Sequence, residues 1–174
     1  MRENPRHVNT SPFTSYNYHG KGNFAQLVDV GTLGATEVDV NFNDNVVTHS
    51  DGVLLHGIGG WQNCLFAKCT ILPVPLFRDR IPVIRDEVTT ICGPGELIDV
   101  IVTERGIAIN PLRKDLIEKV KDSGLPVRSI RELKEEAEKI CGVPAKQKFD
   151  DEIVAVVKWV DGTIIDCIRK VADA

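Results

Sequence analysis

At 174 residues, with 43% hydrophobic and 26% charged side chains, the chain has the size and composition of one globular domain, which excludes a disordered or fibrous protein. Its formal net charge of -4 provides no general basic surface, which argues against nucleic acid as the main partner, because such binding needs clustered Lys and Arg. The sequence has neither an apolar run long enough to span a bilayer nor a signal-peptide core, so we predict a cytoplasmic protein without membrane contact.

The five cysteines form an odd, scattered set without a Cys-x-x-Cys pair. Such thiols stay reduced in the cytoplasm and mostly behave as small core residues. A metal site would require His56, Cys64 and Cys69 to converge, and their spacing is not a standard zinc pattern. We therefore predict no metal.

The chain begins with an irregular segment and continues with short strands. Residues 1–22 are rich in Asn, Ser, Pro, Gly and Tyr without periodicity, which predicts an N-terminal arm before a domain over residues 23–174. Short runs of Val, Ile, Thr and Leu, bounded by Gly, Pro, Asp or Asn, are typical of strands. They cover residues 25–40, 45–58, 69–77, 87–92 and 97–103. The prolines of "TILPVPLF" predict a strand that ends early or lies at an edge.

Two helices and a hairpin are expected after these strands. Asn110 and Pro111 predict an N-cap and first helical position, and Gly124 a stop. The capping box "SIRE" at residues 129–132 begins a second helix that ends at Gly142, and the segment between the helices is a short strand at most. Asp-Gly at 161–162 predicts a C-terminal hairpin. The fold class is therefore α/β, with a mostly parallel sheet and an appended antiparallel hairpin.

The glycine run in "GVLLHGIGGWQNCLFAK" is the first candidate site. Gly57, Gly59 and Gly60 follow an aliphatic segment, and ligands in open α/β sheets bind in loops beyond the strand ends. Glycines there let backbone N–H groups face an anion or a thioester oxygen. A tight turn explains the same residues, and glycine alone does not decide between the two.

Polar side chains supply further candidates, each with a structural alternative. Glu37 stands close to Asn41, Asn43 and Asn45 and could orient a substrate, or the segment could be an Asx-rich turn. Guanidinium groups in "LFRDRIPVIRD" could hold a di- or tricarboxylate or a coenzyme phosphate, or pair with nearby Asp. These groups belong to Arg78, Arg80 and Arg85. The four His residues have no nucleophile partner at a recognisable spacing, so a hydrolytic triad is unsupported.

Five motifs in a fixed order indicate the family more specifically than any one of them does alone. They are "LGATEVDVNFN", "SDGVLLHGIGG", "VPLFRDRIPVIRDEVTT", "GPGELIDVIVTERGIAINP" and "IVAVVKWVDGTIIDCI". This series resembles the C-terminal part of the citrate lyase alpha subunit family, within the coenzyme A transferase superfamily, over about residues 20 to 170.

The resemblance implies a three-layer α/β/α fold and a transferase activity. The family moves an acyl carrier thioester from acetate to citrate, in an oligomeric complex with beta and gamma subunits. The gamma subunit carries a coenzyme-A-derived arm, and coenzyme A thioesters can replace it. Carried over by position, the implied roles are catalytic for Gly59, Gly60 and Glu37, substrate-binding for Asn43, Asn45, Arg78 and Arg80, and cofactor-binding for Gly57 and Asn110.

The chain also departs from the family pattern. The resemblance places the family's first domain outside this chain, so we expect the missing N-terminal half to complete the site. After the glycine doublet, Asn63 occupies an acidic position, and bulky residues up to Phe66 occupy small ones. Two alternatives therefore stay open: a transferase for another carboxylic acid, or a non-catalytic split or truncated domain that binds coenzyme A or serves assembly. We name no covalent nucleophile.

Overall fold

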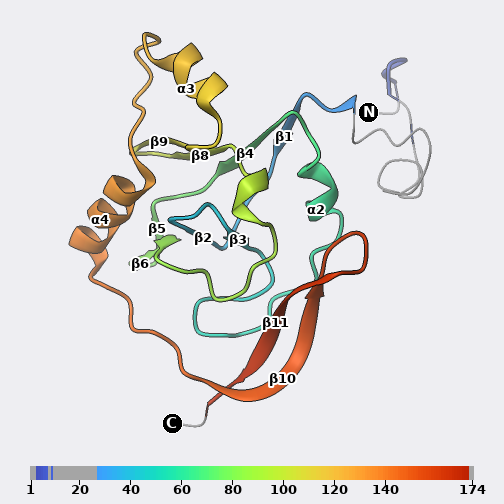
Figure 1. The fold of residues 1–174 in the computed structure, drawn as a ribbon, viewed down its shortest axis with the longest axis vertical. Helices are drawn as coiled ribbons and strands as arrows, with labels where there is room; N and C mark the ends of the chain where they lie inside the picture. The colour runs from blue at the N-terminus through green and yellow to red at the C-terminus, as the bar shows by residue number, and fades with distance from the viewer. Residues whose placement is uncertain (1–2, 8, 10–26, 173–174) are drawn as a thin grey trace.

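A four-stranded sheet forms the centre of the computed structural model, which describes residues 3–7, 9 and 27–172 (Figure 1). Its strand order is β1-β4-β8-β9, with parallel β1–β4 and β4–β8 pairs and an antiparallel β8–β9 pair. The strands are β1 (Val30–Thr32), β4 (Cys69–Pro73), β8 (Val100–Thr103) and β9 (Gly106–Ile109). Ile71 of β4 faces Val100 of β8, and β4 ends at its proline.

Smaller strands form a second sheet and a short ribbon. The second sheet has the order β3-β2-β7, in which β2 (Glu37–Asp39) pairs antiparallel with β3 (Asp44–Asn45) and parallel with β7 (Ile84–Arg85). The ribbon pairs β5 (Phe77–Arg78) with β6 (Ile81–Pro82). Its turn residues, Asp79 and Arg80, have φ of 44° and 68°, as both central residues of a type I′ hairpin turn require.

Within the described ranges, three α-helices and one 3-10 turn connect the strands. They are α2 (Trp61–Cys64), the 3-10 turn Gly95–Leu97, α3 (Lys114–Val120) and α4 (Ile130–Cys141). The capping box predicted for α4 is confirmed: Ser129 Oγ accepts from the N–H of Glu132, and the Glu132 side chain accepts from the N–H of Ser129. The helix packs against β6, β7 and β9 through its buried Leu133 and Ala137.

The C-terminal hairpin predicted around Asp161-Gly162 is confirmed. Strands β10 (Phe149–Lys158) and β11 (Ile164–Val171) pair antiparallel with three register irregularities and occupy the lower edge of Figure 1. A Cβ on Gly52 would lie 2.6 Å from Val171 and 2.8 Å from Phe149, so the loop at Gly52 fits closely against the hairpin.

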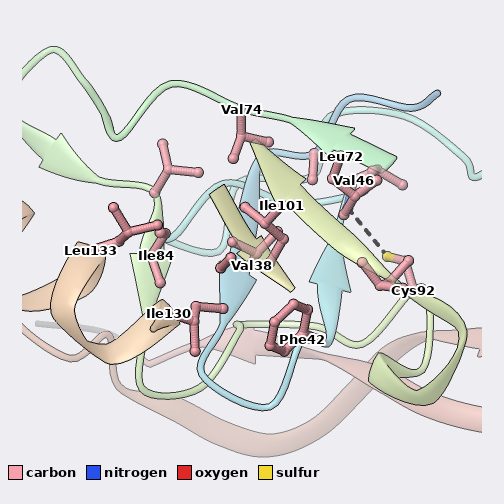
Figure 2. Close-up of a cluster of buried hydrophobic side chains, with 14 of the residues drawn as sticks. Val38, Phe42, Val46, Leu72, Val74, Ile84, Cys92, Ile101, Ile130 and Leu133 are labelled. Atoms are coloured by element: carbon pink, nitrogen blue, oxygen red, sulfur yellow. Dashed lines mark hydrogen bonds between the residues drawn. The ribbon is translucent and has the colours of Figure 1, made fainter. Parts of the chain in front are cut away.

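One hydrophobic cluster unites the two sheets with α4, as Figure 2 shows. Val38 of β2, Leu72 of β4, Ile84 of β7, Ile101 of β8 and Leu133 of α4 are fully buried. The polar ends of β2 and β3 are therefore supported by this hydrophobic core. Separately, none of the helices among the described residues is both long and apolar enough to cross a bilayer.

The α/β class is confirmed, in the form of mixed sheets with few helices. Three local predictions are wrong. The first helix begins at Lys114: Asn110 Oδ1 accepts from the Leu112 N–H as an N-cap would, but residues 111–112 form a turn before the helix. Residues 46–58 contribute one bridge, between Thr48 and Leu54, in place of a strand. Residues 87–92 form no strand, whereas the unpredicted β9 lies before the helix. The predicted arm over residues 1–22 lies mostly outside the described residues.

Candidate functional site

The glycine loop of residues 57–60 is exposed and presents its backbone. Gly59 has a φ of 62°, and a Cβ on Gly57 or Gly59 would meet no atom within 4 Å. Within the described part of the chain, the N–H groups of residues 57–60 donate no hydrogen bond. An exposed segment of unused N–H donors is suited to an incoming oxyanion. The His56 ring also lies at this loop, with Nδ1 donating to the Gly57 carbonyl oxygen at 2.8 Å.

The loop is anchored by the residues that follow it. Trp61 Nε1 donates to the Gly34 carbonyl at 2.9 Å, and the buried Gln62 donates through Nε2 to the Cys92 carbonyl at 2.9 Å. Leu65 is in the hydrophobic core, and the Phe66 ring lies 5.9 Å from that of Trp159. The bulky residues after the doublet therefore attach α2 to the rest of the domain.

Glu37 lies beneath the surface and its carboxylate is occupied by neighbours. It is 3% exposed and accepts from Asn45 Nδ2 at 3.0 Å and from the Thr89 N–H at 2.9 Å. Its Oε1 lies 3.6 Å from the Arg85 guanidinium. Asn45 also donates to Thr48, and its Oδ1 accepts from the N–H groups of Val47 and Thr48. This network joins β2, β3 and the segment at Thr89.

Asn43 and Asn110 meet at Gly95 from different segments. Asn43 donates to Asp39 and accepts the Gly95 N–H at 2.9 Å, while Asn110 donates to the carbonyls of Gly95 and Ile98, both at 2.8 Å. Asn110 is 4% exposed. Both amides therefore hold the 3-10 turn in place, and neither lies in the glycine loop.

The two arginines of the β5–β6 turn differ in their surroundings. Arg78 donates to the carbonyls of Ala35 and Thr36 at 2.8 and 3.1 Å, which fastens the ribbon to the chain before β2. Arg80 is exposed and has no hydrogen-bond or ion-pair partner among the described residues. Of the positions predicted to bind substrate, Asn43, Asn45 and Arg78 make hydrogen bonds within the fold, and the Arg80 guanidinium has no partner among the described residues.

Asp44 is a residue that the sequence did not single out, because "NFNDN" has the composition of an ordinary turn. It is 0% exposed, neither carboxyl oxygen has a hydrogen-bond partner among the described residues, and a Cβ on Gly93 would lie 2.1 Å from Oδ2. Burial, with the charge of Asp39 as a smaller cause, raises the pKa of Asp44 well above its usual value. The Asp44 carboxyl, at the base of α2, therefore keeps its proton to a higher pH than an exposed Asp does.

The thiols of the described residues are free, and burial raises the pKa of Cys92 to about 11. Such a thiol stays protonated and is a poor nucleophile. In the described ranges, no group of three or more His, Cys, Asp and Glu is arranged to hold a metal ion.

Comparison with known proteins identifies the family. The family model for the citrate lyase alpha subunit (CitF) matches residues 1–171. The chain belongs to the citrate lyase alpha subunit family. It is 41% identical to the citrate lyase alpha chain of Klebsiella pneumoniae, over 100% of this chain and 34% of that protein, and 40% identical to that of Escherichia coli K12, over 99% and 34%.

A solved structure shares the fold as well as the sequence. A crystal structure from Streptococcus mutans, described as an alpha subunit of citrate lyase in complex with citrate, superposes with a TM-score of 0.94 at 42% identity, over 99% of this chain and 34% of that one. The chain spans about a third of the length of the family members that it matches.

Proposed function

We propose that this chain is part of a coenzyme A transferase of the citrate lyase alpha type, which moves a thioester from acetate to citrate. The observation that carries the proposal is the glycine loop: this chain, a member of the family, presents the N–H groups of residues 57–60 on an exposed surface, and they donate no hydrogen bond to the described residues. The thioester is carried by coenzyme A or by the coenzyme-A-derived arm of an acyl carrier subunit. The similar crystal structure from Streptococcus mutans also supports citrate as the acid, since it is a complex with citrate.

The reaction needs two carbonyl additions. A citrate carboxylate oxygen attacks the acetyl thioester carbonyl, and the C–S bond breaks to give a mixed anhydride and a thiolate. The thiolate then attacks the citryl carbonyl of the anhydride, which releases acetate and leaves a citryl thioester. Each addition places negative charge on a carbonyl oxygen, and preorganised N–H donors stabilise that charge.

In this proposal the glycines contact the reacting groups directly, and the other predicted residues hold the surrounding segments in position. The N–H groups of Gly59 and Gly60, with that of Gly57 beside the thioester arm, face the oxyanion. Glu37, with Asn43, Asn45 and Asn110, positions the β2–β3 end and the 3-10 turn, because their polar atoms are already engaged.

We further propose that the site is completed by protein outside these residues, with the beta and gamma subunits of a citrate lyase complex as partners in the cytoplasm. A cluster of exposed aliphatic side chains just before the glycine loop supports a contact there. Val53, Leu54 and Leu55 are 55%, 59% and 39% exposed. Three consecutive exposed apolar residues mark a surface that another segment covers.

The test is a thioester exchange assay. The chain is mixed with the portion of the Klebsiella pneumoniae alpha chain that it does not match, together with acetyl-coenzyme A and citrate. The proposal expects citryl-coenzyme A and acetate in equal amounts by mass spectrometry, with neither formed by each part alone. Exchange with another di- or tricarboxylate only would correct the acid, and no exchange with any acid would overturn the proposal.

A further inference from the structure

A groove at the C-terminal end of α4 is not used by the proposed reaction. Two cavities of about 260 and 290 Å³ adjoin there, between the β6–β7 segment and the chain that follows α4. They share Ser50, Arg85, Val143, Pro144 and Gln147, so they form one continuous groove.

Arg85 lies in the wall of both cavities with its hydrogen-bonding capacity unused. Its side chain is 12% exposed, and its guanidinium makes no hydrogen bond within the described residues. Its nearest charge is Glu37 Oε1 at 3.6 Å from Nη1, which is beyond good hydrogen-bond length. A guanidinium has five N–H donors, and a nearly buried donor without an acceptor is costly. Nη1 itself is enclosed on the Glu37 side, and the groove is where an acceptor can reach the rest of the guanidinium.

Arg80 adds a second guanidinium to the 290 Å³ cavity. Its left-handed backbone, at φ 68°, is uncommon for a residue with a Cβ and is fixed by the β5–β6 turn. Unlike Arg78, which donates to two backbone carbonyls, Arg80 is unengaged among the described residues. Arg78 therefore binds to the fold, whereas Arg80 lies at the groove.

The acidic side chains around the groove are largely engaged elsewhere. Lys134 binds Asp86 at 3.1 Å and Glu138 at 2.8 Å, and Asp51 accepts the Val53 N–H at 3.0 Å. Glu87 lines only the 260 Å³ cavity. At the Arg80 end the cavity is lined by Arg80, Arg85 and the hydrogen-bonded Asp51. Glu37 offsets the charge of Arg85, so Arg80 is the guanidinium there without a carboxylate partner among the described residues.

We propose that this groove binds a small organic anion, whose carboxylate or phosphate oxygens accept from the Arg85 guanidinium, with Arg80 as the second cation. Planar guanidinium groups pair with both kinds of oxyanion in two-point contacts. The inference that an anion binds here depends only on the groove and on Arg80 and Arg85. The two sources considered for the anion rest on the proposed function: the carboxylates of the acceptor acid, or the phosphates of coenzyme A.

The test is calorimetric titration of the chain at constant ionic strength, with citrate in one arm and adenosine 3′,5′-bisphosphate in the other. We expect saturable binding in at least one arm, and R80Q to weaken it about ten- to hundredfold. The matched control is R131Q, because Arg131 is an exposed arginine on α4 with no partner among the described residues and outside the groove. Its affinity should equal that of the parent chain.

R85K separates charge from geometry, since lysine keeps the charge and loses the two-point fork. Weaker binding by a folded R85K variant, shown by circular dichroism, supports the proposal. R80Q alone decides the matter if R85K does not fold. Absence of binding in both arms, or equal affinities of R80Q and R131Q, would overturn it. Anion binding in this titration, together with no thioester exchange in the assay of the proposed function, would support this site and refute the proposed function.

Discussion

The exchange of Gly60 for proline removes one backbone N–H from the glycine loop with little other change. Gly60 has a φ of -85°, within about 20° of the value that proline imposes. Its N–H donates no hydrogen bond in the described part of the chain, so its loss breaks none of these contacts. The preceding residue, Gly59, has no Cβ to clash with the proline ring. We therefore expect the unfolding free energy to change by less than about 1 kcal/mol.

Catalysis should respond far more strongly than stability. Loss of one oxyanion donor lowers kcat by about 10²–10³, or roughly 2.7–4 kcal/mol of transition-state stabilisation. Gly60→Ala is the matched control, because alanine also adds a Cβ but keeps the N–H. The assay is the rate of citryl-coenzyme A formation by the complemented chain, with urea unfolding in parallel. If the proline and alanine variants turn over at the same rate, the loop does not stabilise the oxyanion.

Three further predictions concern stability. Glu37→Gln removes the countercharge of the nearly buried Arg85 and should lower the unfolding free energy in urea by about 2–4 kcal/mol, whereas the exposed Glu87→Gln should change it little. Ser129→Ala removes the α4 N-cap and should cost about 1 kcal/mol in the same assay, and an unchanged midpoint would show that the cap is dispensable. Asp44→Asn should gain stability relative to the parent as pH rises above 3.8. The raised pKa keeps the folded acid neutral while the unfolded acid ionises, so the parent loses up to about 1.4 kcal/mol per pH unit until the folded pKa is reached. A difference independent of pH between 4 and 7 would contradict a raised pKa.

Local signals in the sequence predicted the elements that depend on local chemistry. The capping box of α4 and the turn at Asp161-Gly162 use contacts between residues a few positions apart, and both are present as predicted. Asn110 makes the local bond to the Leu112 N–H that the cap pattern predicts, but a turn precedes α3, and its further bonds to the carbonyls of Gly95 and Ile98 are tertiary contacts that no local pattern reveals. The aliphatic residues 53–55 resembled a strand but have a single bridge, because their apolar side chains stay exposed.

The candidate site was predictable only in part for the same reason. Glycines mark an open backbone wherever they lie, so the loop at residues 57–60 could be found from sequence. The burial of Glu37 and the difference between Arg78 and Arg80 depend on partners far along the chain, at Thr89 and Ala35. Asp44 gave no signal, because its raised pKa follows mainly from tertiary burial, which no local pattern reveals.

The most direct measurement of the central claim is oxygen transfer between the two acids. Citrate labelled with ¹⁸O in its carboxylates is incubated with acetyl-coenzyme A and the complemented chain, and the released acetate is analysed by mass spectrometry. Exchange through a mixed anhydride leaves the bridging oxygen of citrate on acetate, so each acetate should carry one ¹⁸O. Acetate without ¹⁸O would show hydrolysis by water and contradict thioester transfer to citrate.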